Sequence, residues 1–123
     1  MYNGHTVILG WTDKTIFVLG ELLAMQGRAA ARQSRSWWAS SSSEQVIVVL
    51  GENDRYRMKR EINLVYPKAT RPRGVRVICR EGLTTEIDDL MRVSIASART
   101  VIVLAASRRP RGLLRVRGFT SFL

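Results

Sequence analysis

The chain contains four short blocks of apolar and β-branched residues, separated by longer polar segments. The blocks span residues 6–9, 45–50, 75–79 and 100–104. Each block is apolar at consecutive positions instead of alternate ones, which is typical of strands covered on both faces of a parallel sheet. The pattern therefore predicts four buried parallel strands.

The segments between these blocks have the spacing of amphipathic helices. Residues 13–26 begin with an acid and place apolar side chains at helical intervals, namely Ile16, Leu19, Leu22 or Leu23, and Met25 or Gln26. Residues 54–66 place four apolar side chains on one side, namely Met58, Ile62, Val65 and Tyr66. A third helix begins at Thr84 or Thr85, has acids in its first turn, and forms an apolar face from Ile87, Leu90 and Met91. The alternation predicts an α/β fold, a Rossmann-like doubly wound parallel sheet of about four strands with right-handed crossovers.

Two segments interrupt this pattern. Residues 28–44 contain Trp37, Trp38 and a run of serines, which predicts a surface loop inserted into a domain that covers residues 1–106. Its two tryptophans form a binding patch or fold back onto the first helix. Residues 107–123 are rich in arginine, and no amphipathic helix leads from the fourth strand to the apolar positions in 113–118. We therefore expect a sheet that is incomplete at the C-terminus, with an uncovered fourth strand and an atypical tail.

Composition places the chain among globular proteins, with 46% hydrophobic and 24% charged residues. No apolar run approaches the roughly 20 residues that cross a bilayer, and the first residues do not resemble a signal peptide. A lone cysteine, Cys79, agrees with a reducing compartment. The formal net charge is +10, but half of it comes from five arginines in the tail. This uneven distribution does not predict a nucleic-acid partner.

In an open parallel sheet, ligands bind at the carboxyl ends of the strands, where the strand order reverses. The first strand ends there in Gly10-Trp11-Thr12-Asp13-Lys14. Gly10 lets a ligand approach the backbone, and the helix behind this turn favours anions. The dinucleotide fingerprint GxGxxG is absent, however, because threonines occupy its second and third glycine positions. A standard NAD site is therefore disfavoured, and the cofactor stays open between a nucleotide and calcium.

Three further residues belong to the same predicted edge, namely Glu52, Arg80 and Glu81. Glu52 follows the second strand, where an acid contacts ribose in nucleotide-binding relatives of the fold; the alternative is a solvated acid that pairs with Arg55. Arg80 and Glu81 contact a ligand or pair with each other across the surface. The carboxylates of Asp13, Glu52 and Glu81 would supply oxygen ligands for a hard cation such as calcium if they converge.

No catalytic set is evident. His5 is the only histidine and precedes the first strand, away from the ligand edge. Cys79 lies inside a strand, where a core role is favoured over a nucleophilic one. Without a metal-binding cluster or a nucleophile–base pair, the sequence indicates a sensor or binding module.

Four strings of the sequence resemble, in order, the cytosolic regulatory domain of the Castor/Pollux family of ion channels. They are HTVILGWTDK at 5–14, VVLGEND at 48–54, VICREG at 77–82, and DLMRVS with ARTVIVLA at 89–94 and 98–105. In that family a Gly-Trp-Ser-Asp-Lys string replaces the glycine-rich fingerprint. The resemblance covers about residues 3–106.

The resemblance implies an RCK-like domain, related to those that regulate potassium conductance. Such domains assemble with other subunits into a tetrameric gating ring on the aqueous side of a transmembrane pore and convert ligand or calcium binding into pore opening. Plant members are nuclear-envelope cation channels linked to calcium signalling. The pore domain and the family's acidic continuation after the fourth strand are missing from this sequence, so the gating role requires a longer protein. An NAD(P)-binding domain of an oxidoreductase is the alternative.

Overall fold

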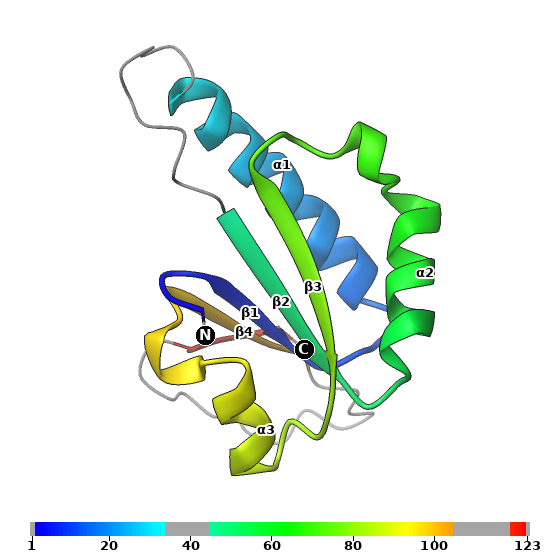
Figure 1. Cartoon of the computed structure of the whole chain (residues 1–123), viewed down its shortest axis with the longest axis vertical. Coiled ribbons are helices and arrows are strands. Elements are labelled where there is room, and N and C mark those ends of the chain that lie inside the picture. The colour runs from blue at the N-terminus through cyan, green and yellow to red at the C-terminus, as the bar shows by residue number, and fades with distance from the viewer. Residues whose placement is uncertain (1, 34–44, 105–118, 123) are drawn as a thin grey trace.

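A computed structural model describes residues 2–33, 45–104 and 119–122, and side chains within 2–26 and 45–104. In these residues a single sheet contains five parallel strands in the order β3-β2-β1-β4-β5 (Figure 1). The strands are β1 (Thr6–Leu9), β2 (Gln45–Gly51), β3 (Val75–Glu81), β4 (Thr100–Leu104) and β5 (Phe119–Phe122). The α/β, Rossmann-like fold predicted from the sequence is confirmed, and the order agrees with the usual 3-2-1-4-5 arrangement of that fold.

The helices lie on both faces of the sheet (Figure 1). They are α1 (Thr15–Gln33), α2 (Arg55–Val65) and α3 (Ile87–Arg92), with two short 3-10 helices, η1 (Lys68–Thr70) and η2 (Ile95–Ser97). Side chains of α1 and α2 pack in one core cluster, and those of α3 and the turn after it pack in another. The strand blocks are apolar at consecutive positions because each faces both clusters.

The two clusters divide each central strand by the alternation of its side chains. Ile8, Ile47 and Val49 face α1 and α2, whereas Val7 and Val48 face α3, and all five are fully buried. Leu19 of α1 and Ile62 of α2 belong to the first cluster, and Met58 of α2 is also fully buried. This double covering fixes the register of the sheet, because a slip by one residue would exchange the two faces.

Two helices differ from the sequence prediction at their ends. α1 continues to Gln33, so the first part of the predicted 28–44 loop is helical; Trp37 and Trp38 lie outside the described residues. α2 begins after Asp54, whose carboxylate accepts hydrogen bonds from the backbone N–H groups of Tyr56 and Arg57. Its predicted core residue Val65 is 53% exposed, since the helix ends there and Tyr66 turns back toward α1.

The predicted apolar face of α3 is wrong. The helix begins at Ile87, after Glu86, and not at Thr84 or Thr85. Ile87 and Met91 are 72% and 68% exposed, and only Leu90 of the predicted trio packs against the sheet. The helix is too short to cover its side of the sheet alone, so Val93 and Ile95 in the following turn complete the cluster.

β5 corrects the expectation of an uncovered fourth strand. It pairs in parallel with β4, from Val101 beside Phe119 to Leu104 beside Phe122. The segment Phe-Thr-Ser-Phe has no continuous apolar block, which is why the hydrophobic pattern did not reveal it. None of the helices in the described part of the chain combines the length and apolar character needed to cross a membrane.

Candidate functional site

The candidate site lies at the carboxyl ends of β1, β2 and β4. After β1 the chain moves to β2 on one side, whereas β4 lies on the other side of β1, so the strand order reverses here. This reversal leaves a crevice at the strand ends in open α/β sheets. The turn from Gly10 to Lys14, which joins β1 to α1, stands at that point.

Gly10 is required by two separate features of this turn. Its φ angle is +117°, a region that side-chain-bearing residues rarely adopt. A Cβ atom at this position would lie 2.6 Å from the carbonyl oxygen of Leu104 in β4. The Gly10 N–H also donates to the carbonyl oxygen of Leu50 in β2 at 2.8 Å. The turn is therefore held against both neighbouring strands.

Hydrogen bonds within the turn occupy backbone groups that a phosphate would need. The Thr12 N–H donates to Oγ1 of the buried Thr15 at 2.8 Å, and that hydroxyl donates to the Gly10 carbonyl at 3.0 Å. The Lys14 N–H donates to Oγ1 of Thr12 at 3.1 Å. Pyrophosphate in dinucleotide-binding domains relies on bare backbone N–H groups at this place. The threonines that replace two fingerprint glycines thus close the usual phosphate cradle.

Trp11 lies over the end of β2. It is half-buried and packs against the core cluster on the α1 and α2 side. A Cβ atom added to Gly51 would lie 2.7 Å from the Cβ atom of Trp11 and 3.0 Å from Sδ of Met58. The turn after β1 and the end of β2 therefore meet at close range, and this contact needs a glycine at position 51.

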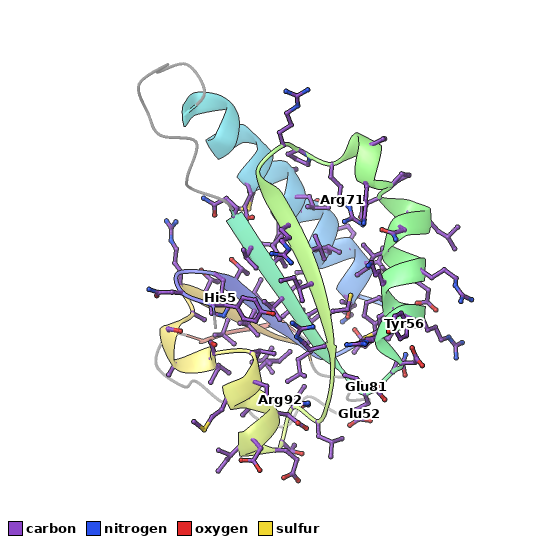
Figure 2. All side chains as sticks on the ribbon, in the orientation of Figure 1. His5, Glu52, Tyr56, Arg71, Glu81 and Arg92 are labelled. Carbon is purple, nitrogen blue, oxygen red and sulfur yellow. The ribbon has the colours of Figure 1, made fainter. Side chains whose placement is uncertain are left out.

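The charged residues predicted at the ligand edge lie around the turn after β1 but do not form one cluster. Asp13, Lys14, Glu52 and Glu81 are exposed. Glu52 follows Gly51, the last residue of β2, and Glu81 is the last residue of β3 and lies beside Gly51, so both acids are at the same end of the sheet (Figure 2). Among the residues that the structure describes, no group of three or more His, Cys, Asp or Glu side chains could hold a metal ion. The carboxylates of Asp13, Glu52 and Glu81 thus do not converge as the calcium hypothesis required.

The alternative ion pairs considered for these residues are not formed either. Within the described ranges the ion pairs are Arg57–Glu61 and Arg92–Asp89. Arg55 donates to the Tyr56 hydroxyl at 2.8 Å instead of pairing with Glu52. Arg80 donates to the Tyr2 hydroxyl at 2.6 Å and lies 6.0 Å from the centre of that ring, away from Glu81.

His5 and Cys79 occupy structural positions. His5 is buried at the amino end of β1, where Nε2 donates to the carbonyl of Val93 at 2.7 Å. Its Nδ1 has no hydrogen-bond partner among the described residues. Cys79 packs against the α1 and α2 core cluster, and burial raises the pKa of its thiol to about 11. A thiol with so high a pKa is protonated at neutral pH, which supports the core interpretation.

Comparisons with known proteins give a consistent result. No model of a known protein family matches the chain. The chain is 36% identical to the ion channel CASTOR of Lotus japonicus over 103 residues, which is 84% of this chain and 10% of the relative. It is 38% identical to the ion channel DMI1 of Medicago truncatula over 104 residues, 85% of this chain and 10% of the relative. It is 37% identical to the probable ion channel POLLUX of Oryza sativa subsp. japonica over 102 residues, 83% of this chain and 9% of the relative.

Over most of its own length, the chain is therefore similar to ion channels of the Castor/Pollux family. It spans about a tenth of the length of the curated relatives it matches. The resemblance read from the strings around Gly10, Glu52 and Arg80 is thereby confirmed for the family.

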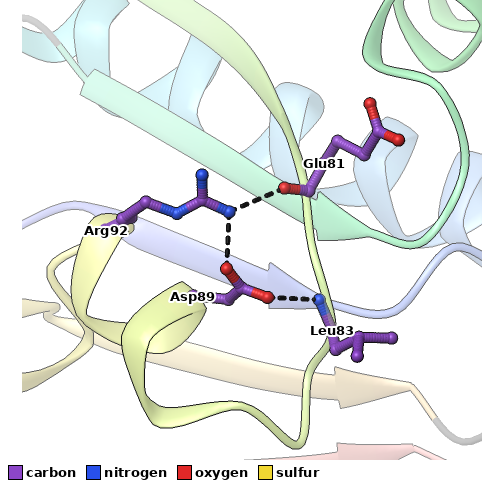
Figure 3. Close-up of polar contacts among 4 residues, drawn as sticks. All are labelled: Glu81, Leu83, Asp89 and Arg92. Carbon is purple, nitrogen blue, oxygen red and sulfur yellow. Dashed lines mark hydrogen bonds and ion pairs between the residues drawn. The ribbon is translucent and has the colours of Figure 1, made fainter.

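Sequence reasoning missed a clamp between β3 and α3 (Figure 3). Arg92 donates to the backbone carbonyl of Glu81 at 2.9 Å and to Oδ1 of Asp89 at 2.6 Å. Oδ2 of Asp89 accepts from the Leu83 N–H at 2.8 Å. A Cβ atom at Gly82 would lie 2.8 Å from Cγ of Asp89, so the clamp needs that glycine. The spacing of Asp89 and Arg92, three residues apart on a helix, was the available signal.

Proposed function

We propose that this chain is a regulatory, ligand-sensing segment of a Castor/Pollux-type cation channel and forms part of a gating ring with other subunits. The observation that carries the proposal is its identity of 34–38% with channels of this family over most of its length. The Rossmann-type strand order supports it, because in such sheets ligands bind at the strand ends where the order reverses, and the turn after β1 stands at that point. The ligand edge consists of this turn, from Gly10 to Lys14, and Glu52.

The turn is built to sense a ligand at its outer surface. Its backbone is fixed by Gly10 and by the hydroxyls of Thr12 and Thr15. The side chains of Asp13 and Lys14 remain exposed beside it. A ligand that contacts these side chains acts on a turn bonded to both β2 and α1, so binding here is transmitted to the rest of the sheet.

Exposed apolar side chains support contact with another subunit. Leu83, Ile87 and Met91 repeat at four-residue intervals and are 42%, 72% and 68% exposed. Ile87 and Met91 lie on one side of α3, because residues four apart share a helix face, and Leu83 precedes that helix. Burial of such a stripe against a neighbouring subunit would stabilise an assembly by about 25 cal/mol for each Å² of apolar surface removed from water.

The alternative function is an NAD(P)-binding domain of an oxidoreductase. Its strongest support is Glu52, the acid after β2. Against it stands the turn after β1, whose Thr12 and Lys14 N–H groups are bonded to threonine hydroxyls. Calorimetric titration of the chain with NADH separates the two proposals. Stoichiometric binding that is lost in Glu52→Ala favours the oxidoreductase.

A channel chimera tests the regulatory role. Residues 3–106 replace the matching segment of Lotus japonicus CASTOR, and single-channel open probability is recorded against cytosolic Ca²⁺ alone and NADH alone. We expect the open probability to respond to one of them. Asp13→Asn should shift the midpoint about tenfold if the effective probe is the cation, and Lys14→Gln should do so if it is the anion.

Two exposed helical residues provide matched controls. Glu21→Gln on α1 and Arg60→Gln on α2 remove the same charges away from the turn. Equal midpoints in Asp13→Asn, Lys14→Gln and both controls would refute the ligand edge. A chimera that conducts and responds to neither probe would contradict the sensing role itself.

A further inference from the structure

A basic groove runs along β3. This strand is the last one at one side of the sheet (Figure 1). The groove has a volume of about 730 Å³ and is bounded by α2, β3 and the segment between them. Two of its lining residues, Tyr56 and Arg71, lie near opposite ends of α2 (Figure 2). The groove is separate from the ligand edge, because none of residues 10–14 lines it.

The floor of the groove is the free edge of β3. All residues from 75 to 80 line it, although successive side chains of a strand point to opposite faces of the sheet. Side chains from both faces of the sheet can line one groove only if that groove runs along the free edge of the strand. The peptide groups that bond to β2 belong to even-numbered residues of β3 and its flanks. The Gly74 carbonyl accepts from the Gln45 N–H, and the Gly82 N–H donates to the Gly51 carbonyl. Because a parallel ladder alternates, the peptide groups of Val75, Val77 and Cys79 face outward.

The lining is strongly and uniformly charged. Seven of its fifteen residues are lysine or arginine, and none is aspartate or glutamate. Arg55 and Lys59 come from α2, and Arg76 and Arg80 come from β3. The ion pairs found in the described ranges involve none of these seven cations. The groove therefore has a positive potential that no carboxylate of this part of the chain neutralises.

We propose that the β3 edge binds an extended acidic peptide segment, which adds to the sheet as a sixth strand. An edge strand offers main-chain hydrogen bonds to such a peptide, and the flanking side chains select its sequence. Cations stand on both faces of the edge, so aspartate or glutamate side chains on either side of the added strand meet a lysine or arginine. The six residues of β3 that line the groove span about 20 Å, which matches six or seven residues of extended peptide.

Charged side chains on an edge strand also prevent edge-to-edge aggregation. That role would explain Arg76 and Arg80, which belong to β3. It does not explain the other five cations, which come from α2 and the segment after it and line the same groove. Convergence from separate elements points to a charged partner.

The groove fits an acidic peptide better than a compact phosphate or a nucleic acid. The first N–H groups of α2, which would favour a phosphate, are occupied by the carboxylate of Asp54. Single-stranded nucleic acid binds on aromatic stacking platforms, whereas Tyr56 is the one aromatic residue of this lining and is covered by Arg55 at 4.8 Å. The free peptide groups of β3 match an extended backbone.

Fluorescence anisotropy with the full 123-residue chain tests the proposal. The probe is a labelled eight-residue peptide in which glutamate and valine alternate. A second peptide of equal charge carries N-methyl groups on two adjacent central amides, which blocks hydrogen bonding on both of its edges. We expect the methylated peptide to bind at least about tenfold more weakly. Equal binding of both peptides would mean that charge alone attracts them and would overturn strand addition.

Charge reversals locate the site. Lys59→Glu and Arg76→Glu should each weaken binding about tenfold. Arg60→Glu is the matched control, since Arg60 is exposed on α2 and does not line the groove. Thermal unfolding confirms that each variant is folded. Equal losses in all three variants, or no binding of the peptide, would refute the site. Displacement of the peptide by a tenfold lower concentration of oligouridine or inositol hexakisphosphate would also overturn the proposal. This test does not depend on the channel role.

Discussion

Gly10→Ala is the sharpest test of how the turn after β1 is held. The substitution adds one methyl group at a position where φ is +117°. A non-glycine residue in such a backbone region raises the free energy of the folded state by about 1–3 kcal/mol. The added Cβ also lies 2.6 Å from the Leu104 carbonyl oxygen, a backbone atom that cannot rotate away.

The close contact between the added Cβ and the Leu104 carbonyl oxygen forces β1 and β4 apart, because it is about 1 Å shorter than an ordinary carbon–oxygen approach. Overpacking of this kind destabilises by about 1–3 kcal/mol. We therefore expect Gly10→Ala to lower the free energy of unfolding by about 4 kcal/mol. Domains of this size have about 5–15 kcal/mol in total, so the loss is a large part of the stability.

Urea unfolding followed by far-UV circular dichroism measures this change. Gly74→Ala is the matched control, because Gly74 has a φ angle of +80° and no atom within 4 Å of an added Cβ. Gly74→Ala places a side chain in the same unfavourable φ region but creates no short contact. It should therefore lower the free energy of unfolding by only about 1–3 kcal/mol. If the two variants lose the same stability, the approach to Leu104 does not constrain the turn and the reasoning is refuted.

Three further substitutions or treatments test other parts of the structure. Met58→Ala should lower the free energy of unfolding by about 2–5 kcal/mol in urea, since its side chain is fully buried; a loss below about 1 kcal/mol would contradict the α2 packing. Asp54→Ala should cost about 1 kcal/mol through the lost helix cap, with Asp88→Ala, which makes no such cap, as its comparison. Cys79 should react with iodoacetamide at pH 8 roughly 100-fold more slowly than in the urea-unfolded chain, because its pKa of about 11 leaves little thiolate, and the rate should rise as the pH approaches 11. Reaction at the unfolded rate would show an accessible thiol.

The strands could be predicted closely from the sequence. Burial on both faces makes residues 6–9 and 100–104 continuously apolar, and the structure begins and ends both strands at those positions. The parallel fold followed from the same pattern. The turn at Gly10 could also be identified, since the end of an apolar block followed by glycine and a helix start is a local signal.

The environment of each side chain was less predictable. Ile87 and Met91 have helical spacing, but α3 has only six residues and Val93 and Ile95 provide the missing cover. The basic groove was missed for a different reason. Its cations are scattered between positions 55 and 80, and only the edge position of β3 beside α2 brings them together. Half of the formal net charge of +10 lies in the tail, so the overall charge does not indicate this internal cluster.

The contact between Trp11 and Gly51 constrains the two positions differently, because it involves the Cβ atom of Trp11 and not its ring. The nearest atom to a Cβ at position 51 is the Cβ atom of Trp11, which every residue except glycine possesses. Exchanging the indole for a smaller side chain therefore leaves the demand for glycine at 51 unchanged. Loss of the indole would cost its packing against the core, whereas any side chain at position 51 would collide with the backbone-proximal atoms of residue 11.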